Sequence, residues 1–303
     1  METRRPLDAI AVVLMVLLTS LWGFQQVAVK LAAPGISLVM QGAIRSGIAT
    51  LLVMAWARFR GIVLWQRDGT LVPGFVAGLL FAGEFALIYA GLAYTTAARM
   101  IVFIYLAPVL TALGLSWFLP SERLRPGQWA GVALAFGGIV AAFADGFGAD
   151  RATLLGDALG FIAAIGWAAT TVVIRTTALA RSAATRVLFY QLAVSAALLP
   201  LASLALGEPG IIQLTPVSVA SLAYQAIVVA FASYLVWFWL LTRYLGGRLT
   251  AFAFLTPLFG VAFGHYFLGD RITWAFLVAV VLVGAGIALV NLRANRPALP
   301  LQT

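Results

Sequence analysis

Ten apolar stretches of about 20 residues follow one another along this chain, separated by short polar connections. They occupy residues 9–30, 36–57, 71–92, 97–119, 127–144, 155–175, 186–206, 216–242, 250–268 and 272–292. A helix needs about 20 mainly apolar residues to cross a bilayer, and its backbone groups must bond to one another because lipid offers them no partner. The sequence therefore predicts an all-α integral membrane protein with ten transmembrane helices, and too little chain remains for a soluble domain.

Composition excludes several other classes of protein. Hydrophobic residues make up 63% of the chain and charged residues 10%, whereas soluble domains carry roughly 45–50% and 25%. The chain has no cysteine, which excludes disulfides and thiolate metal sites, and its single histidine, His265, excludes a histidine cluster. We therefore expect no metal and no cofactor. The first apolar run is longer than the roughly 7–15 residues of a signal-peptide core, so we interpret it as an uncleaved helix.

The net charge of +9 is concentrated on one side of the predicted membrane. The outer side holds Lys30, Arg99, Arg151 and Arg271, and Arg45 lies within a span. Because cytoplasmic loops are enriched in Lys and Arg, both termini are predicted to be cytoplasmic, and the charge requires no nucleic acid as partner. Fourteen of the nineteen Lys and Arg residues then lie on the cytoplasmic side: Arg4, Arg5, Arg58, Arg60, Arg67, Arg123, Arg125, Arg175, Arg181, Arg186, Arg243, Arg248, Arg293 and Arg296.

The second half of the chain repeats short motifs of the first. Each half, 1–146 and 147–303, holds five predicted spans, and an odd number makes the second repeat cross the membrane in the opposite sense. Inverted repeats around a central site are typical of alternating-access transporters, so we expect one membrane-embedded domain with a central cavity. The motifs recur 145 to 150 residues later: "SLWGFQQVAVK" (20–30) as "IGWAATTVVIR" (165–175), "VMQ" (39–41) as "FYQ" (189–191), "YLAPVLT" (105–111) as "FLTPLFG" (254–260), and "GGIV" (137–140) as "AGIA" (285–288).

Two prolines occupy equivalent positions in the two repeats. Pro108 lies near the middle of the fourth predicted span and Pro257 in the ninth. Proline removes a backbone donor and clashes with the preceding helical turn, and interrupted helices at matching places in two repeats indicate the binding site of a transporter. We predict a role for both in gating or in lining the site. A static bend is the alternative, because proline is common in membrane helices.

A known family resembles the chain over nearly its whole length. The signature region is "YLAPVLTALGLSWFLPSERLRPGQWAGVALAFGGIV" (105–140), and "GDRIT" (269–273) is its weaker copy. This region is similar to that of the EamA-type members of the drug/metabolite transporter superfamily. Its recognisable elements are Pro108, the turn Ser121–Leu124, Gly127, Gly131, Gly137 and Gly138.

The resemblance carries implications that the residue pattern alone does not. It implies a carrier in the bacterial inner membrane that moves small metabolites, often outward, and within the superfamily the chain is most similar to bacterial amino-acid exporters. It implies a central cavity lined by the first, third, fourth, sixth, eighth and ninth helices. The implied partners are a small-molecule substrate and membrane lipid, and the protein is compatible with working as a monomer.

Three charged residues lie within or beside the predicted spans. Glu84 is the only acid deep in a span, and such residues usually face a cavity or a partner. We predict that it couples protons or contacts a substrate ammonium; a protonated or arginine-paired structural group is the alternative. Arg45, in the second span, either pairs with Glu84 as a strut, which we favour, or binds a carboxylate. Asp157 is interpreted as the cap of the sixth predicted helix.

Aromatic and polar side chains recur along the helices that the resemblance assigns to the cavity. Such a cavity, with few charges, suits an amphipathic zwitterion with an apolar side chain; hydrogen bonding between helices is the structural alternative. Trp237 and Trp239 are two residues apart on a helix, so one of them should face lipid. The predicted lining residues are Trp22, Gln25, Gln26, Glu84, Tyr89, Tyr105, Trp167, Thr170, Thr171 and Tyr234.

Small residues predict where helices approach closely. Residues with no side chain, spaced four apart on a membrane helix, let two backbones pack together. His265, near the end of the ninth span, is interpreted as a structural group, with a pH sensor as the alternative. Four GxxxG pairs occur: Gly74 and Gly78, Gly127 and Gly131, Gly156 and Gly160, and Gly260 and Gly264.

These features predict a secondary transporter that exports small organic solutes by alternating access, with amino acids as the leading substrate class. A proton-coupled exporter of cationic compounds that uses Glu84 remains open. A nucleotide-sugar carrier would want several deep cations, and only Arg45 is deep. A membrane-embedded enzyme would want clustered acids or histidines, which the chain lacks. A channel would not need two alternative gates.

Overall fold

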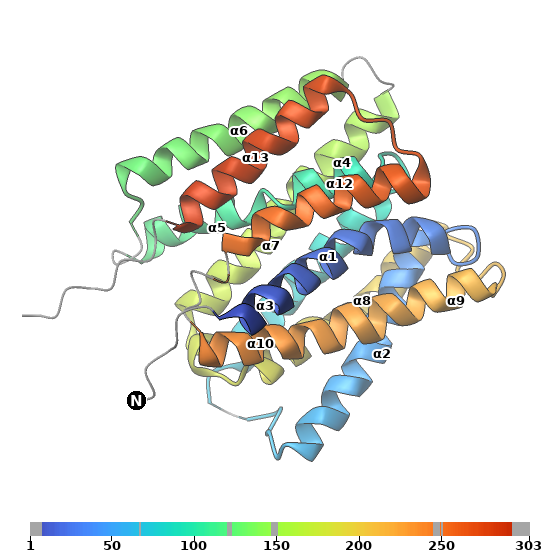
Figure 1. Ribbon diagram of the computed structural model, residues 1–303. Helices are drawn as coiled ribbons and strands as arrows, with labels where there is room; N and C mark the ends of the chain where they lie inside the picture. The colour runs from blue at the N-terminus through green and yellow to red at the C-terminus, as the bar shows by residue number, and fades with distance from the viewer. Residues whose placement is uncertain are drawn as a thin grey trace, which may run out of the picture.

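The computed structural model describes residues 8–66, 68–119, 123–146, 151–244, 249 and 251–292, and it is helical throughout (Figure 1). Six of the basic residues used to predict the orientation lie outside the described residues, as do Ser121 and Glu122 of the signature turn. Those basic residues are Arg4, Arg5, Arg67, Arg248, Arg293 and Arg296.

Helices fall within every range that the sequence marks as apolar. In the first half they are α1 (Ala9–Ala32), α2 (Leu38–Phe59), α3 (Leu71–Gly91), α4 (Ala97–Ile104), α5 (Ala107–Phe118) and α6 (Pro126–Gly146). In the second half they are α7 (Arg151–Thr176), η2 (Ala178–Arg181), α8 (Ala184–Ala205), α9 (Pro216–Ala223), η3 (Tyr224–Ser233), α10 (Tyr234–Arg243), η4 (Ala251–Phe254), α12 (Leu255–Leu268) and α13 (Trp274–Leu292). η2 and η4 are 3-10 helices, whereas η3 is a π-helix.

Seven helical segments among the described residues are long and apolar enough to cross a membrane: Ala9–Ala32, Leu38–Phe59, Leu71–Gly91, Ala97–Phe118, Arg151–Thr176, Ala184–Ala205 and Pro216–Trp237. Three more apolar helices are shorter: Pro126–Ala142, Leu255–Leu268 and Trp274–Leu289. The chain is therefore a multi-pass, all-α membrane protein, which confirms the predicted class. That all ten segments cross stays a prediction.

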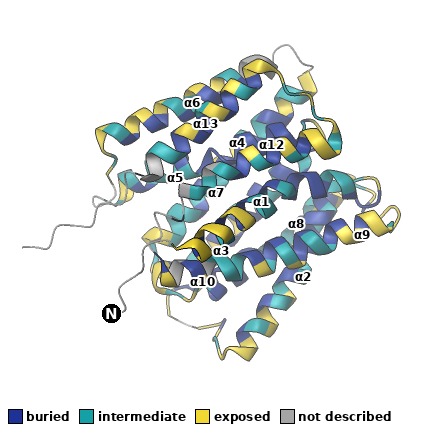
Figure 2. Cartoon of the chain, viewed as in Figure 1, coloured by how far each residue is buried: buried dark blue, intermediate teal, exposed yellow. Residues whose placement is uncertain are grey.

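The helices pack around α4, in which every residue is buried. α6 lies along α13, α2 packs on α8, α1 on α12, and α3 on α7, so that helices from the two halves of the chain interleave (Figure 1). Exposed residues recur along the peripheral helices, for example α6 and α9 (Figure 2). Many of the exposed residues are large and apolar, such as Trp117, Tyr266 and Trp274. A surface of this kind is suited to lipid rather than to water.

The GxxxG residues of α3 and α7 lie where helices meet, as predicted. A methyl group added at Gly74 would meet the ring of Tyr190 at 2.5 Å, and one at Gly78 would meet Val194 at 2.6 Å. At Gly156 it would meet the Thr95 side chain at 2.6 Å. At these glycines α3 packs closely on α8, and α7 packs closely on the start of α4. A larger residue would collide with the neighbouring helix.

Two connections contact the start of a helix in the opposite half. In the connection between α8 and α9, the Glu208 carboxylate accepts hydrogen bonds from the backbone N–H groups of Val39 (2.9 Å) and Met40 (3.0 Å), in the first turn of α2. In the connection between α2 and α3, Asp68 accepts a hydrogen bond from the guanidinium of Arg186 at the start of α8 (2.6 Å). The Glu208 carboxylate is favoured at its position by the free N–H groups and the dipole of α2.

Candidate functional site

Both predicted prolines lie at helix interruptions. α4 ends at Ile104, and Pro108 stands in the first turn of α5, where a backbone donor is not needed. Pro257 stands in the first turn of α12, directly after the 3-10 turn η4. The prolines therefore begin new helices rather than bending continuous ones. Tyr105, at the first interruption, is carried into the buried centre of the molecule.

A chain of buried hydrogen bonds crosses that centre. The Tyr89 hydroxyl, on α3, accepts from Gln25 Nε2 on α1 (3.4 Å) and donates to Gln225 Oε1 in η3 (2.8 Å). Gln225 Nε2 donates to Gln41 Oε1 on α2 (2.9 Å). Gln41 Nε2 in turn donates to the backbone carbonyls of Val29 and Ile36. This chain joins four elements through groups that are all removed from solvent.

Gln41 and Gln225 are absent from the predicted site. Gln41 appears in the sequence only as a match to Gln191 between the repeats, and Gln225 is a lone amide in an apolar span. A polar side chain in lipid is costly unless it is paired. Any glutamine inside a predicted span was therefore a usable signal for the site.

Glu84 and Arg45 are both buried in this centre, exposed by 5% and 1%. They are close enough for electrostatic attraction, but no ion pair or hydrogen bond joins them, so the predicted direct strut is wrong. The guanidinium carbon of Arg45 instead lies 4.4 Å from the ring centroid of Phe85. Glu84 Oε2 and Arg45 Nε and Nη1 are buried without a hydrogen-bond partner.

Aromatic side chains complete the cluster. Tyr105 meets Trp167 of α7 edge to face, with ring centroids 5.5 Å apart. The Tyr234 hydroxyl lies within electrostatic reach of both Arg45 and Glu84. The structure therefore brings these three predicted aromatic residues to the same buried region as the two charges.

Trp22 lies on α1, three residues before Gln25. Its indole N–H donates to Ser233 Oγ (2.9 Å), and its ring meets Trp237 edge to face. Trp239, by contrast, is 36% exposed. This confirms that one member of the Trp237 and Trp239 pair faces outward.

The remaining predicted lining residues make fewer contacts with the cluster. Thr170 and Thr171 donate to carbonyls of their own helix, those of Gly166 and Trp167. Gln26 is buried, and its Oε1 has no hydrogen-bond partner.

Asp157 is not a helix cap, because α7 begins six residues earlier, at Arg151. It is fully buried and accepts hydrogen bonds from Arg99 Nε (3.0 and 3.1 Å) and from Thr95 Oγ1 (2.7 Å). Arg99 also donates to the carbonyl of Ala142. The predicted cap is therefore an ion pair that holds α4 to α7.

Asp270 belongs to the connection between α12 and α13, and its side chain reaches the start of α4 on the predicted outer face. Its Oδ2 accepts from the backbone N–H of Ala98 (3.0 Å), and its carbonyl oxygen lies 2.9 Å from Nδ1 of His265. Burial raises the pKa of the Asp270 carboxyl, opposed by the Ala98 hydrogen bond and by Lys30. His265 thus closes the end of α12, which supports its structural interpretation.

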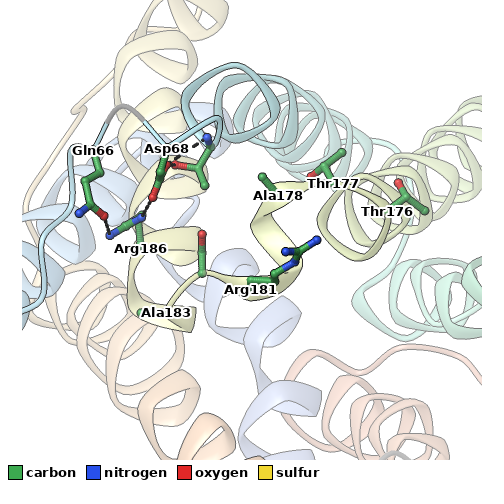
Figure 3. A pocket seen from close by; sticks show the side chains of 10 residues that line it. Gln66, Asp68, Thr176, Thr177, Ala178, Arg181, Ala183 and Arg186 are labelled. Atoms are coloured by element: carbon green, nitrogen blue, oxygen red, sulfur yellow. Dashed lines mark hydrogen bonds and ion pairs between the residues drawn. The ribbon is translucent and has the colours of Figure 1, made fainter.

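A hollow of about 650 Å³ lies on the predicted cytoplasmic face and contains none of the predicted site residues (Figure 3). Arg186 reaches between Gln66 and Asp68 on one side, while Arg181 and Thr177 line the other (Figure 3). Hydrogen bonds from Thr70 and Arg186 outweigh burial and lower the pKa of the Asp68 carboxyl. Asp68 is therefore ionised at neutral pH.

Comparison with known proteins decides the family. The model of the EamA-like transporter family matches the chain twice, at residues 9–144 and 154–292. The chain belongs to the EamA-like transporter family. This family lies within the drug/metabolite transporter superfamily, as the sequence motifs indicate. The chain is therefore a transporter.

Curated relatives cover most of the EamA-like chain. A protein of Escherichia coli named "Probable amino-acid metabolite efflux pump" is 25% identical over 91% of this chain and 92% of its own length. An "Uncharacterized transporter" of Archaeoglobus fulgidus is 27% identical over 82% of this chain and 86% of its own length. A crystal structure aligns with a TM-score of 0.65 at 22% identity, over 95% of this chain and 99% of that one, and supports the fold alone.

Proposed function

We propose that this EamA-like protein exports amino acids across the bacterial inner membrane. The observation that carries the proposal is the centre of the protein. There the buried Glu84 and Arg45 lie within electrostatic reach of Tyr105 and Tyr89, and Trp167 packs on Tyr105. A carboxylate, a guanidinium and aromatic rings suit a small zwitterion with an apolar side chain. The names of the bacterial relatives point to the same substrate class.

In this proposal ten segments cross the membrane as two inverted repeats, 1–146 and 147–303. Helix contacts that recur when each helix is replaced by its counterpart in the other repeat support this arrangement. α1 packs on α12 as α7 packs on α4 and α5, and α3 packs on α7 as η3 and α9 pack on α1. Helices α2 and α8, and likewise α6 and α13, are each other's counterparts and pack together. The two matches of the family model are compatible with this division.

The two connections that contact helix starts of the opposite half also support inversion. The α8–α9 connection lies on the start of α2, and the α2–α3 connection lies on the start of α8. With both termini in the cytoplasm, as the positive charges predict, the first contact faces outward and the second inward. Equivalent contacts on opposite faces give a carrier two related conformations.

Alternating access then uses the interruptions at Pro108 and Pro257 as the places where the inner helices bend. We expect alanine at either position to lower transport more than folded yield, because a continuous helix has lost its break. The measurement is initial uptake into proteoliposomes divided by the amount of monodisperse protein. Equal losses of uptake and yield would assign both prolines to folding alone.

The export proposal is tested with purified protein in liposomes and a panel of labelled amino acids. We expect saturable uptake of apolar or aromatic amino acids, reduced at least about tenfold by Glu84→Gln and by Trp167→Ala. Matched controls are Asp270→Asn, an acid outside the cluster, and Trp117→Ala, an exposed tryptophan, both of which should transport normally. Folded protein that carries none of the panel would overturn the proposal.

A proton-coupled exporter of cationic compounds is the second candidate, since a buried carboxylate also suits a cation. Arg45 disfavours it, because a guanidinium beside Glu84 repels a second positive charge. Uptake of tetraphenylphosphonium driven by a pH gradient, with no competition by amino acids, would favour this candidate over the first.

A further inference from the structure

Two opposite charges in the centre of the protein are left without the partners that buried charges require. Glu84 on α3 and Arg45 on α2 are each more than nine-tenths buried. Glu84 Oε2, Arg45 Nε and Arg45 Nη1 make no hydrogen bond. A buried ion that is neither paired nor hydrogen-bonded is costly. Something that the protein binds should therefore satisfy these groups.

The same fold pairs its structural charges directly. Arg99 and Asp157 meet through several hydrogen bonds across α4 and α7, with Thr95 and Ala142 satisfying further atoms. Glu84 and Arg45 attract one another, yet no ion pair joins them. The two unbonded charges in the centre thus differ from the Arg99–Asp157 pair that serves the structure.

We propose that Glu84 and Arg45 form a clamp for both charged groups of one zwitterion, with the substrate ammonium on Glu84 and its carboxylate on Arg45. This inference rests on the proposed export of amino acids and deepens it. A carboxylate accepts readily from an ammonium group, and the planar guanidinium fork fits a carboxylate. In an α-amino acid one carbon atom joins the two charged groups, so the molecule bridges side chains that do not meet.

The surrounding residues assign the rest of the substrate. The Phe85 ring already lies against the Arg45 guanidinium, and the Tyr105 and Trp167 rings adjoin the same region. The amide oxygen of Gln25 is a further buried acceptor without a partner. The clamp therefore selects α-amino acids with apolar or aromatic side chains and a free ammonium and carboxylate.

A compound with only one of the two charges leaves the other side chain buried and unpaired. Sites built to bond a polar group reject analogues that lack it by large factors. For the wild type we expect 2-phenylethylamine and 3-phenylpropionate to compete with labelled phenylalanine at least about 100-fold less well than unlabelled phenylalanine does. Leucine with its amine and acid analogues provides a second set.

The variants separate a clamp from a structural role. In Glu84→Gln, binding of phenylalanine should weaken, and 3-phenylpropionate should compete nearly as well as phenylalanine because it has no ammonium group. In Arg45→Gln, binding of phenylalanine should also weaken, and 2-phenylethylamine should compete nearly as well because it has no carboxylate. Substitution of a residue with a merely structural role would weaken the binding of phenylalanine and of both analogues together. Asp270→Asn, on the predicted outer face, and Arg181→Gln, on the predicted cytoplasmic face, remove the same charges outside the centre and should keep the selectivity of the wild type. Size-exclusion profiles confirm folding before each assay.

Ligand-dependent melting of the detergent-solubilised protein provides a readout without transport. Phenylalanine should raise the melting temperature of the wild type, whereas neither single-charge analogue should do so at the same concentration. If phenylalanine is transported but both analogues compete equally well, or if the two variants keep the wild-type selectivity, the clamp is wrong and the exporter stands. If no amino acid of the panel is transported, the export proposal itself fails.

Discussion

Asp157→Asn is expected to lower the melting temperature of the purified protein by about 6–20 °C. Asp157 is fully buried and neutralises Arg99, which is also buried. Removing one charge of such a pair typically costs about 3–5 kcal/mol, because the other charge stays in a low-dielectric environment. At roughly 2–4 °C per kcal/mol, that loss gives the stated range. Intrinsic tryptophan fluorescence during heating is the measurement.

Asp270→Asn is the matched control on the same predicted outer face. Burial already raises the pKa of the Asp270 carboxyl, so its charge is not favoured there, and an asparagine oxygen still accepts from the Ala98 N–H. We expect a change within about 1 kcal/mol. Equal melting temperatures for Asp157→Asn and the wild type would show that the Arg99 pair contributes no net stability.

Hydropathy predicted the helical segments well because lipid imposes one rule on every span. An apolar stretch must bond its own backbone, so its ends follow from composition: α3 spans Leu71–Gly91 where the sequence predicts 71–92. The sequence predicts the start of α7 too late, at 155, because the polar residues Arg151 and Thr153 in its first turn do not belong to the apolar stretch. That error made Asp157 look like a cap.

The site was predictable in its residue types but not in its pairings. Glu84, Tyr89 and Tyr105 stand out because polar or aromatic groups in lipid-spanning helices usually serve a function. Which of them meet depends on helix rotation, which a single sequence does not give. The partnership of Tyr89 with Gln225, 136 residues away, is of this kind. The absence of an ion pair between Arg45 and Glu84 likewise depends on small shifts of α2 against α3.

The π-helix η3 had no signal in the sequence at all. "YQAIVVAFAS" reads as an ordinary apolar span, yet its N–H groups bond five residues back. Such segments are rare and are frequently found at functional sites. η3 carries Gln225 near one end and Ser233 at the other, whose partners lie on α1, α2 and α3.

Deleting Ile227 is therefore expected to abolish most transport while the protein still folds. A one-residue deletion lets the segment take up α-helical hydrogen bonds, which turns α10 relative to α9 and moves Tyr234 away from the Arg45 and Glu84 centre. The side chain of Ile227 is exposed, so its removal takes no contact from the core. Because Tyr234 leaves the centre, phenylalanine uptake should fall at least about tenfold. The melting temperature should fall by only the few degrees that the lost Trp22–Ser233 hydrogen bond contributes.

Ile227→Ala is the control for that deletion, because it removes the same side chain and keeps the π register. It should transport as the wild type does, which separates the register from the loss of surface contact with lipid. A deletion variant that melts normally and transports normally would show that the π-helix has no part in the cycle. If the deletion variant unfolds while Ile227→Ala is stable, the π-helix serves the structure of the protein. In that case an α-helix without the extra residue could not bring Gln225 and Ser233 to their partners at the same time.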